Sequence, residues 1–520
     1  MAKPQTPFSI VAPGSLGLNT KSASLDLGPL WATDTKNAVI ATDGTIAARE
    51  GWQQTFETPL SGEPDVKSIH EYIDSSGNRR IIFAAGNKIY ENENNPVDVT
   101  GTIPEPTDDN WKFVTFNNKC LGVQKDHCLI RKEDGGDFEE VNTDKACSSP
   151  YEILSAWGRV WIVSNNRQTI FYSDLLQEDT FNGGSSGLLD MQTVWSRGTD
   201  EIVALAEFNN LLVVMGRRQV VLFQGADNPN QDLAIVDIIT NIGCIARDSV
   251  QNVGPDVLFL SEDGVISLAR NLETGSLPIS NVTENVSNSL ALIIRSENTD
   301  NIKSVYNIED GYYLITFPTS NRVYYLSFRY LTDQDRETED ISVKARISKP
   351  RITFWTDITP TAFHYTQDGR ILLGKEGLVG RYTGYLDNGE EYDFEIKTGW
   401  FSGEGEIGTT KKIFKQASHV IRAGFSVVLV FEWYYDYQAV GHDSGVREIE
   451  ANSAPSEYGI AEYGLSEYTA NNFVSTVVYN MSGSGKTFRL GYRARINGSN
   501  LELQRTELFM KTGKINRRAR

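Results

Sequence analysis

A short strand-turn-strand unit recurs along the chain at spacings of 40 to 57 residues, and this repeat constrains the fold more than any other feature. The clearest copy, residues 201–225, holds three apolar runs separated by breaks at residues 209–210 and 216–218. Runs this short, rich in β-branched residues and bounded by turn formers, favour strands over helix. The Asn209-Asn210 pair suits a tight hairpin because Asn tolerates positive φ. Each unit is therefore predicted to be a small antiparallel meander.

The repeat predicts a β-propeller over residues 66–385, because several strands per 40 to 50 residues are typical of propeller blades. The first apolar residues of the units are Ile69, Phe113, Ile153, Ile202, Val250, Val305 and Ala362. A long series of hairpins in one or two sandwiches is the alternative. The first and last units are the least regular, so we expect six or seven blades. A helix is expected near residues 283–294, where Val286, Leu290 and Ile294 share one helical face.

The two ends of the chain differ from the repeat. Residues 1–65 are predicted to be an irregular segment, which supplies either a strand that closes the propeller ring or an arm that reaches a neighbour. Residues 391–510 begin a new β texture, and the alternation in residues 501–510 is that of a half-buried strand. The chain is therefore predicted to be all-β, a propeller platform followed by a β-sandwich-like docking domain and a basic tail over residues 511–520.

Two segments are candidate protein-docking sites. A tyrosine recurs every five residues in SEYGIAEYGLSEYT, at Tyr458, Tyr463 and Tyr468, and exposed tyrosines give a large contact area at low entropic cost. The alternative is a decorated loop with no partner. The tail KTGKINRRAR is basic in an acidic chain, which indicates docking on an acidic neighbour or a phosphate through Arg517, Arg518 and Arg520, or else a frayed end.

Composition argues against several classes of function. A net charge of −19 is unsuited to gripping nucleic acid, although it allows a surface past which DNA slides. No apolar run reaches the length of a membrane span, and no secretory signal is visible, so we expect synthesis in a cytoplasm. The four cysteines match neither a disulfide framework nor a zinc pattern and are expected to be buried thiols. No metal and no cofactor are expected.

No motif in the chain indicates catalysis. Gly483 to Thr487, GSGKT, is similar to the end of a phosphate-binding loop, but Asn480 stands where the first glycine belongs and a strand-like segment follows. It is predicted to be a hairpin turn. Propeller glycosidases need two carboxylates that face one bond, and no spacing singles out such a pair. No catalytic residue is assigned, and the chain is predicted not to be an enzyme.

One region resembles a known family. Residues 158–270 contain, in order, GRVWIVSNNRQTIFYSDLL, TFNGG, EIVALAEFNNLLVVMGRRQVVLFQG, IGCIARDSV and VLFLSEDGVISL. This order is similar to the propeller of tail nozzle proteins of short-tailed double-stranded DNA phages, also called tail tubular protein B or packaged-DNA stabilisation proteins. Gly243-Cys244 and Asp263-Gly264 stand at the family's corresponding points, and residues 43–53, DGTIAAREGWQ, resemble its early segment.

The resemblance implies a structural protein of the virion's short tail, made in the host cytoplasm. Six copies would form a ring, a homohexamer, below the portal and its head-to-tail adaptor protein. The ring would continue the DNA channel, retain packaged double-stranded DNA, let it pass during ejection and carry tail fibres or spikes. Two alternatives stay open: a propeller glycan hydrolase or carbohydrate-binding protein of a phage tail, and a general scaffold propeller in a host cell.

Overall fold

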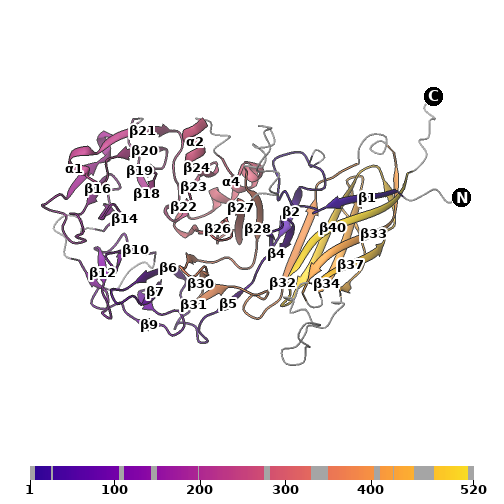
Figure 1. The fold of residues 1–520 in the computed structure, drawn as a ribbon, viewed down its shortest axis with the longest axis horizontal. Helices are drawn as coiled ribbons and strands as arrows, with labels where there is room; N and C mark the ends of the chain where they lie inside the picture. The colour runs from indigo at the N-terminus through magenta and orange to yellow at the C-terminus, as the bar shows by residue number, and fades with distance from the viewer. Residues whose placement is uncertain are drawn as a thin grey trace, which may run out of the picture.

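The structure is a computed structural model that describes residues 6–512 except 25–26, 105–109, 142–148, 197, 275–280, 330–348, 403–409, 425–426 and 450–472. Two bodies lie side by side along its long axis (Figure 1). One is a ring of small antiparallel sheets, and the other is a pair of larger sheets built from both ends of the chain. The all-β prediction is confirmed.

Seven sheets form the ring, so the propeller has seven blades. Blade 1 holds β6 (Val66–Ile73), β7 (Arg79–Ala85), β8 (Lys88–Glu91) and β9 (Val97–Asp98). Blade 2 holds β10 (Lys112–Phe116), β11 (Lys119–Val123), β12 (Ile130–Lys132) and β13 (Glu139–Glu140). Blade 3 holds β14 (Glu152–Ala156), β15 (Arg159–Val163), β16 (Thr169–Tyr172) and β17 (Gly187–Asp190). Blade 4 holds β18 (Ile202–Phe208), β19 (Leu211–Gly216), β20 (Gln219–Gln224) and β21 (Ala234–Thr240).

The remaining blades depart from this plan. Blade 5 holds β22 (Gln251–Val253), β23 (Asp256–Ser261) and β24 (Gly264–Ser267). Blade 6 holds β25 (Lys303–Asn307), β26 (Tyr312–Phe317), β27 (Arg322–Ser327) and β28 (Arg351–Trp355). Blade 7 holds β29 (Ala362–Tyr365), β30 (Ile371–Lys375), β31 (Leu378–Tyr382) and, from the N-terminal segment, β5 (Trp52–Gln54).

The hairpins follow from local turn chemistry. In blade 4, Phe208 pairs with Leu211, so Asn209 and Asn210 form a two-residue loop. Their φ angles of 47° and 63° are both positive, as a type I′ turn requires. Blade 2 repeats the arrangement with Asn117 and Asn118, at φ angles of 46° and 60°. The predicted hairpin at residues 209–210 is therefore confirmed.

Helices accompany blade 5. Helix α2 (Leu268–Thr274) follows β24 directly, and helix α4 (Ser287–Ser296) comes after it in the chain. Leu290 and Ile294 of α4 are buried in a core that also holds side chains of blades 5 and 6. The predicted helix near residues 283–294 is confirmed, and it covers the ring where the described part of blade 5 has three strands.

The N-terminal segment is not irregular as expected, because its described residues, 6–24 and 27–65, hold five strands. β5 pairs with β31, with Trp52 opposite Tyr382 and Gln54 opposite Gly380, and so closes the ring. The other strands, β1 (Thr6–Val11), β2 (Ala32–Lys36), β3 (Ala38–Ile40) and β4 (Ile46–Ala48), join the second body. Of the two roles that the sequence left open, ring closure is the one the structure assigns to β5.

The second body is a β-sandwich. One sheet contains β1, β3, β4, β33 (Lys412–Ala423), β37 (Phe473–Asn480), β38 (Ser484–Gly485) and β40 (Leu501–Thr512). The other contains β2, β32 (Tyr392–Thr398), β34 (Val427–Tyr435), β35 (His442–Asp443), β36 (Arg447–Ile449) and β39 (Phe488–Ile496). Buried and solvent-facing residues alternate along β32 and β33, as in sheets that pack face to face.

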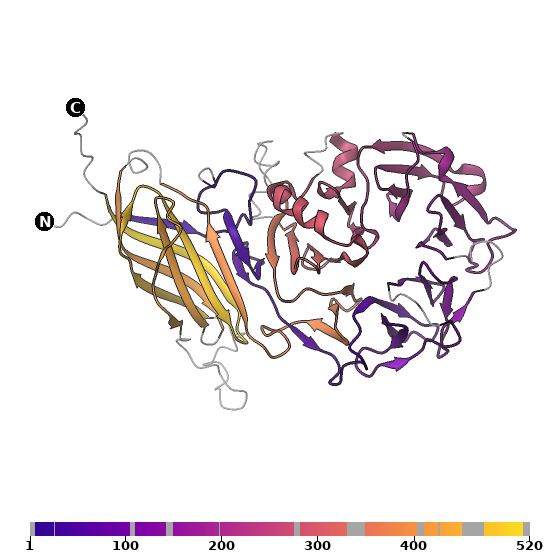
Figure 2. The ribbon, with the colours of Figure 1, turned by 180° about the vertical axis from the view of Figure 1, so that it is seen from behind.

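The propeller and the sandwich share one hydrophobic core. Leu314 and Leu373, from blades 6 and 7, belong to the same buried cluster as Ile396 and Phe431 of the sandwich. Figure 2 shows the sandwich directly beside these blades. Separate domains usually meet through smaller and more polar interfaces, so a continuous apolar core indicates that the two bodies move as one.

A buried arginine marks this junction. The Arg49 side chain is fully buried, and its guanidinium donates to both carboxylate oxygens of Asp387, at 2.8 and 2.6 Å. The guanidinium carbon lies 4.1 Å from the centre of the Tyr392 ring and 6.0 Å from that of Trp355. A bidentate pair under aromatic rings is a strong, directional contact. Arg49 therefore joins the N-terminal segment to both bodies.

Candidate functional site

The innermost strands of three blades each begin with a charged residue: Lys112 on β10, Glu152 on β14 and Lys303 on β25. Blade 5 adds Arg247 and Asp248 from a 3-10 helix that precedes β22 (η2, Arg247–Ser249). Innermost strands run beside the propeller axis, so residues at their starts lie at a similar level. We name these five residues the axial cluster.

Ion pairs connect the axial cluster. Asp248 lies between two cations, with Oδ2 2.5 Å from Lys303 Nζ and Oδ1 2.9 Å from Arg247 Nε. Glu152 pairs with Lys112 through Oε1, and its Oε2 lies 3.8 Å from Arg247 Nε. Three cations thus share two carboxylates, which leaves an excess of positive charge within the cluster.

Burial perturbs the charged groups of the cluster. Burial alone would raise the pKa of Asp248, but Arg247 and Lys303 outweigh it and hold this pKa far below its usual range. The pKa of Glu152 is raised because burial outweighs the attraction of Lys112 and Arg247. The pKa of Lys303 is lowered because burial outweighs the attraction of Asp248. Asp248 is therefore fully compensated, whereas the Lys303 charge is not.

Four residues of the cluster, Lys112, Arg247, Asp248 and Lys303, line a pocket of about 170 Å³ at the propeller axis. The pocket is also lined by Lys67 and His70 of β6 and by His364 of β29. The two imidazole rings are 5.5 Å apart, and His364 Nε2 accepts a hydrogen bond from the Glu71 backbone N–H at 3.1 Å. Neutral His364 therefore carries its proton on Nδ1. Burial lowers the pKa of His70 to about 3 and of His364 to about 4, so both rings are neutral near pH 7.

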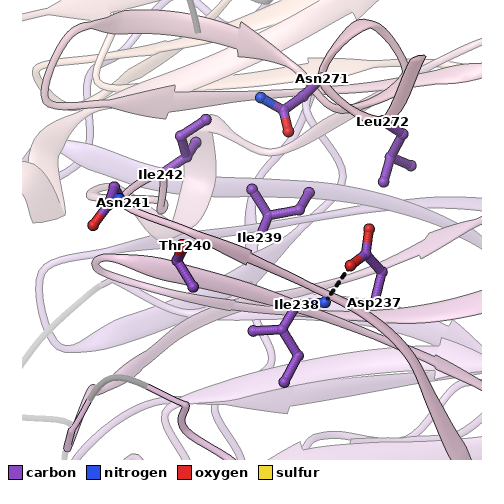
Figure 3. Close-up of a pocket in the computed structure, with 8 residues that line it drawn as sticks. All are labelled: Asp237, Ile238, Ile239, Thr240, Asn241, Ile242, Asn271 and Leu272. Atoms are coloured by element: carbon purple, nitrogen blue, oxygen red, sulfur yellow. Dashed lines mark hydrogen bonds between the residues drawn. The ribbon is translucent and has the colours of Figure 1, made fainter. Parts of the chain in front are cut away.

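A second hollow, of about 410 Å³, lies at the outer edge of blade 4 (Figure 3). It is lined by residues 237–242, at the end of β21 and just beyond it, and by Asn271 and Leu272 of α2. Among the described residues, β21 pairs with β20 alone, and Ile235 and Val236 are 47% and 50% exposed. We name residues 234–242 the blade-4 edge. An exposed apolar edge strand is a template for pairing with another chain.

The docking residues predicted from the sequence lie outside the described residues. Tyr458, Tyr463 and Tyr468 fall in residues 450–472, and Arg517, Arg518 and Arg520 fall in residues 513–520. The axial cluster was missed by sequence reasoning. A signal for it existed, because Lys112 and Glu152 stand immediately before the apolar residues that mark their repeats, Phe113 and Ile153.

The structure corrects two minor predictions. The GSGKT stretch is not a hairpin turn, because it connects β37 to β39 and these strands lie in different sheets. Within the stretch, β38 pairs with β33, and the backbone N–H groups of Lys486 and Thr487 donate to Asp436 Oδ1. The prediction that the cysteines are thiols is wrong for Cys128, which is disulfide-bonded, whereas Cys120 and Cys244 are free and buried.

No protein-family model matches the chain, and no curated protein matches it either. Among solved structures, it is similar to a streptogramin B lyase, at 10% identity and a TM-score of 0.39, over 64% of this chain and 97% of that one. It is similar to the computationally designed protein Ika8, at 13% identity and a TM-score of 0.37, over 64% and 99% of the two chains. It is also similar to the extracellular domain of the putative one component system BT4673 from B. thetaiotaomicron, at 10% identity and a TM-score of 0.40, over 84% of this chain and 62% of that one. Similarities this low assign neither a family nor a function.

The fold and the described residues define a class: a seven-bladed β-propeller fused to a β-sandwich through a shared core. Among the described residues, no group of three or more His, Cys, Asp or Glu side chains could hold a metal ion. Within the same residues, no helix is long and apolar enough to cross a membrane.

Proposed function

We propose that this protein is a structural subunit of the tail nozzle of a short-tailed double-stranded DNA phage. Six copies form a ring below the head-to-tail adaptor, continue the DNA channel, retain the packaged DNA, let it pass at ejection and carry the fibres or spikes. The proposal rests on the resemblance over residues 158–270. The structural observation that supports it most is the blade-4 edge.

The blade-4 edge is suited to contact with a second copy of the chain. β21 has the sequence AIVDIIT, with one charged residue in seven, and no strand in the described part of the chain pairs with its outer side. Natural proteins protect such edges with charges, bulges or covering elements when they act alone. β21 lies along the rim of the ring, away from the sandwich (Figure 1). A contact between this edge of one copy and a different surface of the next is heterologous, and heterologous contacts close into rings when the rotation allows.

Two further properties fit a conduit for DNA. The shared core and the Arg49–Asp387 pair make each subunit one stiff body, as a ring that holds pressurised DNA requires. The net charge of −19 disfavours adhesion of a passing phosphate backbone.

The axial pocket does not favour the glycan-hydrolase alternative. Glycosidases use two carboxyl groups that flank one bond, one of them as a proton donor. Glu152 is fully buried and paired with Lys112, and the low pKa of Asp248 makes it a poor proton donor at neutral pH. No catalytic residue is therefore assigned under this proposal.

The ring is tested by electron microscopy of the purified full-length protein and of phage particles that carry it. We expect rings for the wild-type chain, and antibody label against residues 391–510 on the short tail. Val236→Asp should abolish the rings while leaving the circular dichroism and the unfolding midpoint of the monomer unchanged. Val97→Asp is the matched control, because Val97 lies on the outer strand of blade 1 and is 53% exposed.

Other outcomes would contradict the proposal. Particles that lack the protein would exclude a role in the virion. Label on peripheral fibres would favour a carbohydrate-binding protein of the tail. Rings that survive Val236→Asp as well as they survive Val97→Asp would exclude the blade-4 edge as the contact.

A further inference from the structure

The axial pocket concentrates positive charge in an acidic protein. Its lining includes four cationic side chains, Lys67, Lys112, Arg247 and Lys303, but Asp248 is the one carboxylate among the described residues that line it. Glu152, which lies behind Lys112, is fully buried. The pocket wall is thus cationic, whereas the whole chain carries a net charge of −19.

The pocket also offers a neutral donor. His364 uses Nε2 to accept the Glu71 N–H, so the Nδ1–H of this ring is the group that remains to donate. His70 lies beside it, with Nε2 2.9 Å from Thr115 Oγ1. The Nδ1–H of His364 next to ammonium groups forms a donor set typical of sites that bind oxyanions.

We infer that the axial pocket binds a small tetrahedral oxyanion, with inorganic phosphate as the simplest example. The size of the pocket supports a small ligand. It measures about 170 Å³ and is walled by blades 1, 2, 5, 6 and 7. A water molecule takes roughly 30 Å³ in the liquid, so this space suits one oxyanion and a few waters. The inference does not depend on the proposed function.

The bound anion would neutralise the excess charge of the axial cluster. Lys303 is 5% exposed, and burial lowers its pKa although Asp248 lies beside it, so its charge is only partly compensated. An anion in the pocket would stabilise the charged form of Lys303 and raise the pKa values of His70 and His364. Binding would also connect five blades across the axis and so stabilise the ring.

The test is a titration of the purified full-length protein with inorganic phosphate, with sodium chloride added to keep the ionic strength constant. Binding is measured by calorimetry and by the imidazole NMR signals of His70 and His364. We expect a saturable heat, shifts confined to these two of the five histidines, and an unfolding temperature that rises with phosphate concentration.

Three variants locate the site. Lys67→Met removes a half-buried wall cation and should weaken phosphate binding about tenfold or more, the usual cost of losing a charged hydrogen-bond donor. Lys303→Met should weaken it as well, but Lys303 is buried in ion pairs and its loss also affects folding. Lys88→Met is the matched control, because Lys88 also belongs to blade 1 but pairs with Asp98 outside the pocket.

Three results would overturn the inference. If phosphate changed the heat, the NMR signals and the unfolding temperature no more than sodium chloride does, its effect would be ionic screening and not binding. Equal phosphate affinity of Lys67→Met and Lys88→Met would place the ligand elsewhere. Displacement of phosphate by a short single-stranded oligonucleotide without terminal phosphate would identify a nucleic-acid backbone, and not a small free anion, as the ligand.

Discussion

Two buried arginines in this chain have opposite surroundings. Arg49 has one carboxylate, which it binds with two hydrogen bonds, and aromatic rings lie over its guanidinium. Arg247 shares Asp248 with Lys303, lies near Glu152 and lines a pocket. Burial of a charge is costly in both places, and only good geometry and full compensation offset that cost. The charge of Arg49 at the junction is fully compensated, which suits a contact that joins two bodies. The axial cluster has an excess of positive charge, which suits the binding of an anion.

The largest effect is expected at the junction. Arg49→Met leaves Asp387 mostly buried, with its side chain 12% exposed and without its cation, so we expect the free energy of unfolding to fall by about 3–5 kcal/mol. Chemical denaturation of the full chain measures the change. Arg49→Met combined with Asp387→Asn should recover part of it, because the second change removes the unpaired charge.

The exposed Lys88–Asp98 pair provides the control for this prediction. Both side chains are more than 40% exposed, at 49% and 41%, and Lys88→Met should cost at most about 1 kcal/mol. An unfolding midpoint of Arg49→Met equal to that of Lys88→Met would mean that the junction pair does not join the two bodies.

A smaller effect is expected in the axial cluster. Glu152→Gln removes the charged partner of Lys112, but Arg247 still pairs with Asp248. We therefore expect the free energy of unfolding to fall by about 1–3 kcal/mol, less than for Arg49→Met at the junction. The same denaturation experiment ranks the two sites. If Glu152→Gln lowered the free energy of unfolding more than Arg49→Met does, the axial cluster and not the junction would be the more important site for stability.

The smallest effect concerns pH. His70 and His364 have pKa values of about 3 and 4 in the folded protein, below the ordinary value of 6.5. Below pH 6.5 the unfolded chain therefore binds more protons than the folded protein. The free energy of unfolding is highest with respect to these two groups above pH 6.5, and it decreases as the pH falls towards 4. Both rings are half-buried, so we expect His364→Gln to reduce the loss between pH 6.5 and 5 by on the order of 1 kcal/mol. Identical pH profiles of wild type and variant would exclude titration of His364 as a source of instability.

Local sequence predicted the elements that depend on local chemistry. The pair Asn209-Asn210 specifies a hairpin by itself, and the repeated meander specifies blades. The sequence left open whether the N-terminal segment closes the ring, because Gln54 of β5 pairs with Gly380 from the other end of the propeller and no local pattern encodes that choice. The axial cluster could not be predicted from local sequence for the same reason, because Lys112, Arg247 and Lys303 come close together only when the ring has closed.

The pairing of the first strand with the last has a consequence for biosynthesis. Thr6 of β1 lies opposite Met510 of β40, so β1 stays without this partner on the ribosome until β40 has been synthesised. Blades 1 to 6 can fold in order as they emerge, but β1 and β4 must wait with unpaired edges. A nascent chain of this topology is therefore a natural client for chaperones, and a prematurely terminated product that lacks β40 would keep those edges exposed to proteolysis and aggregation.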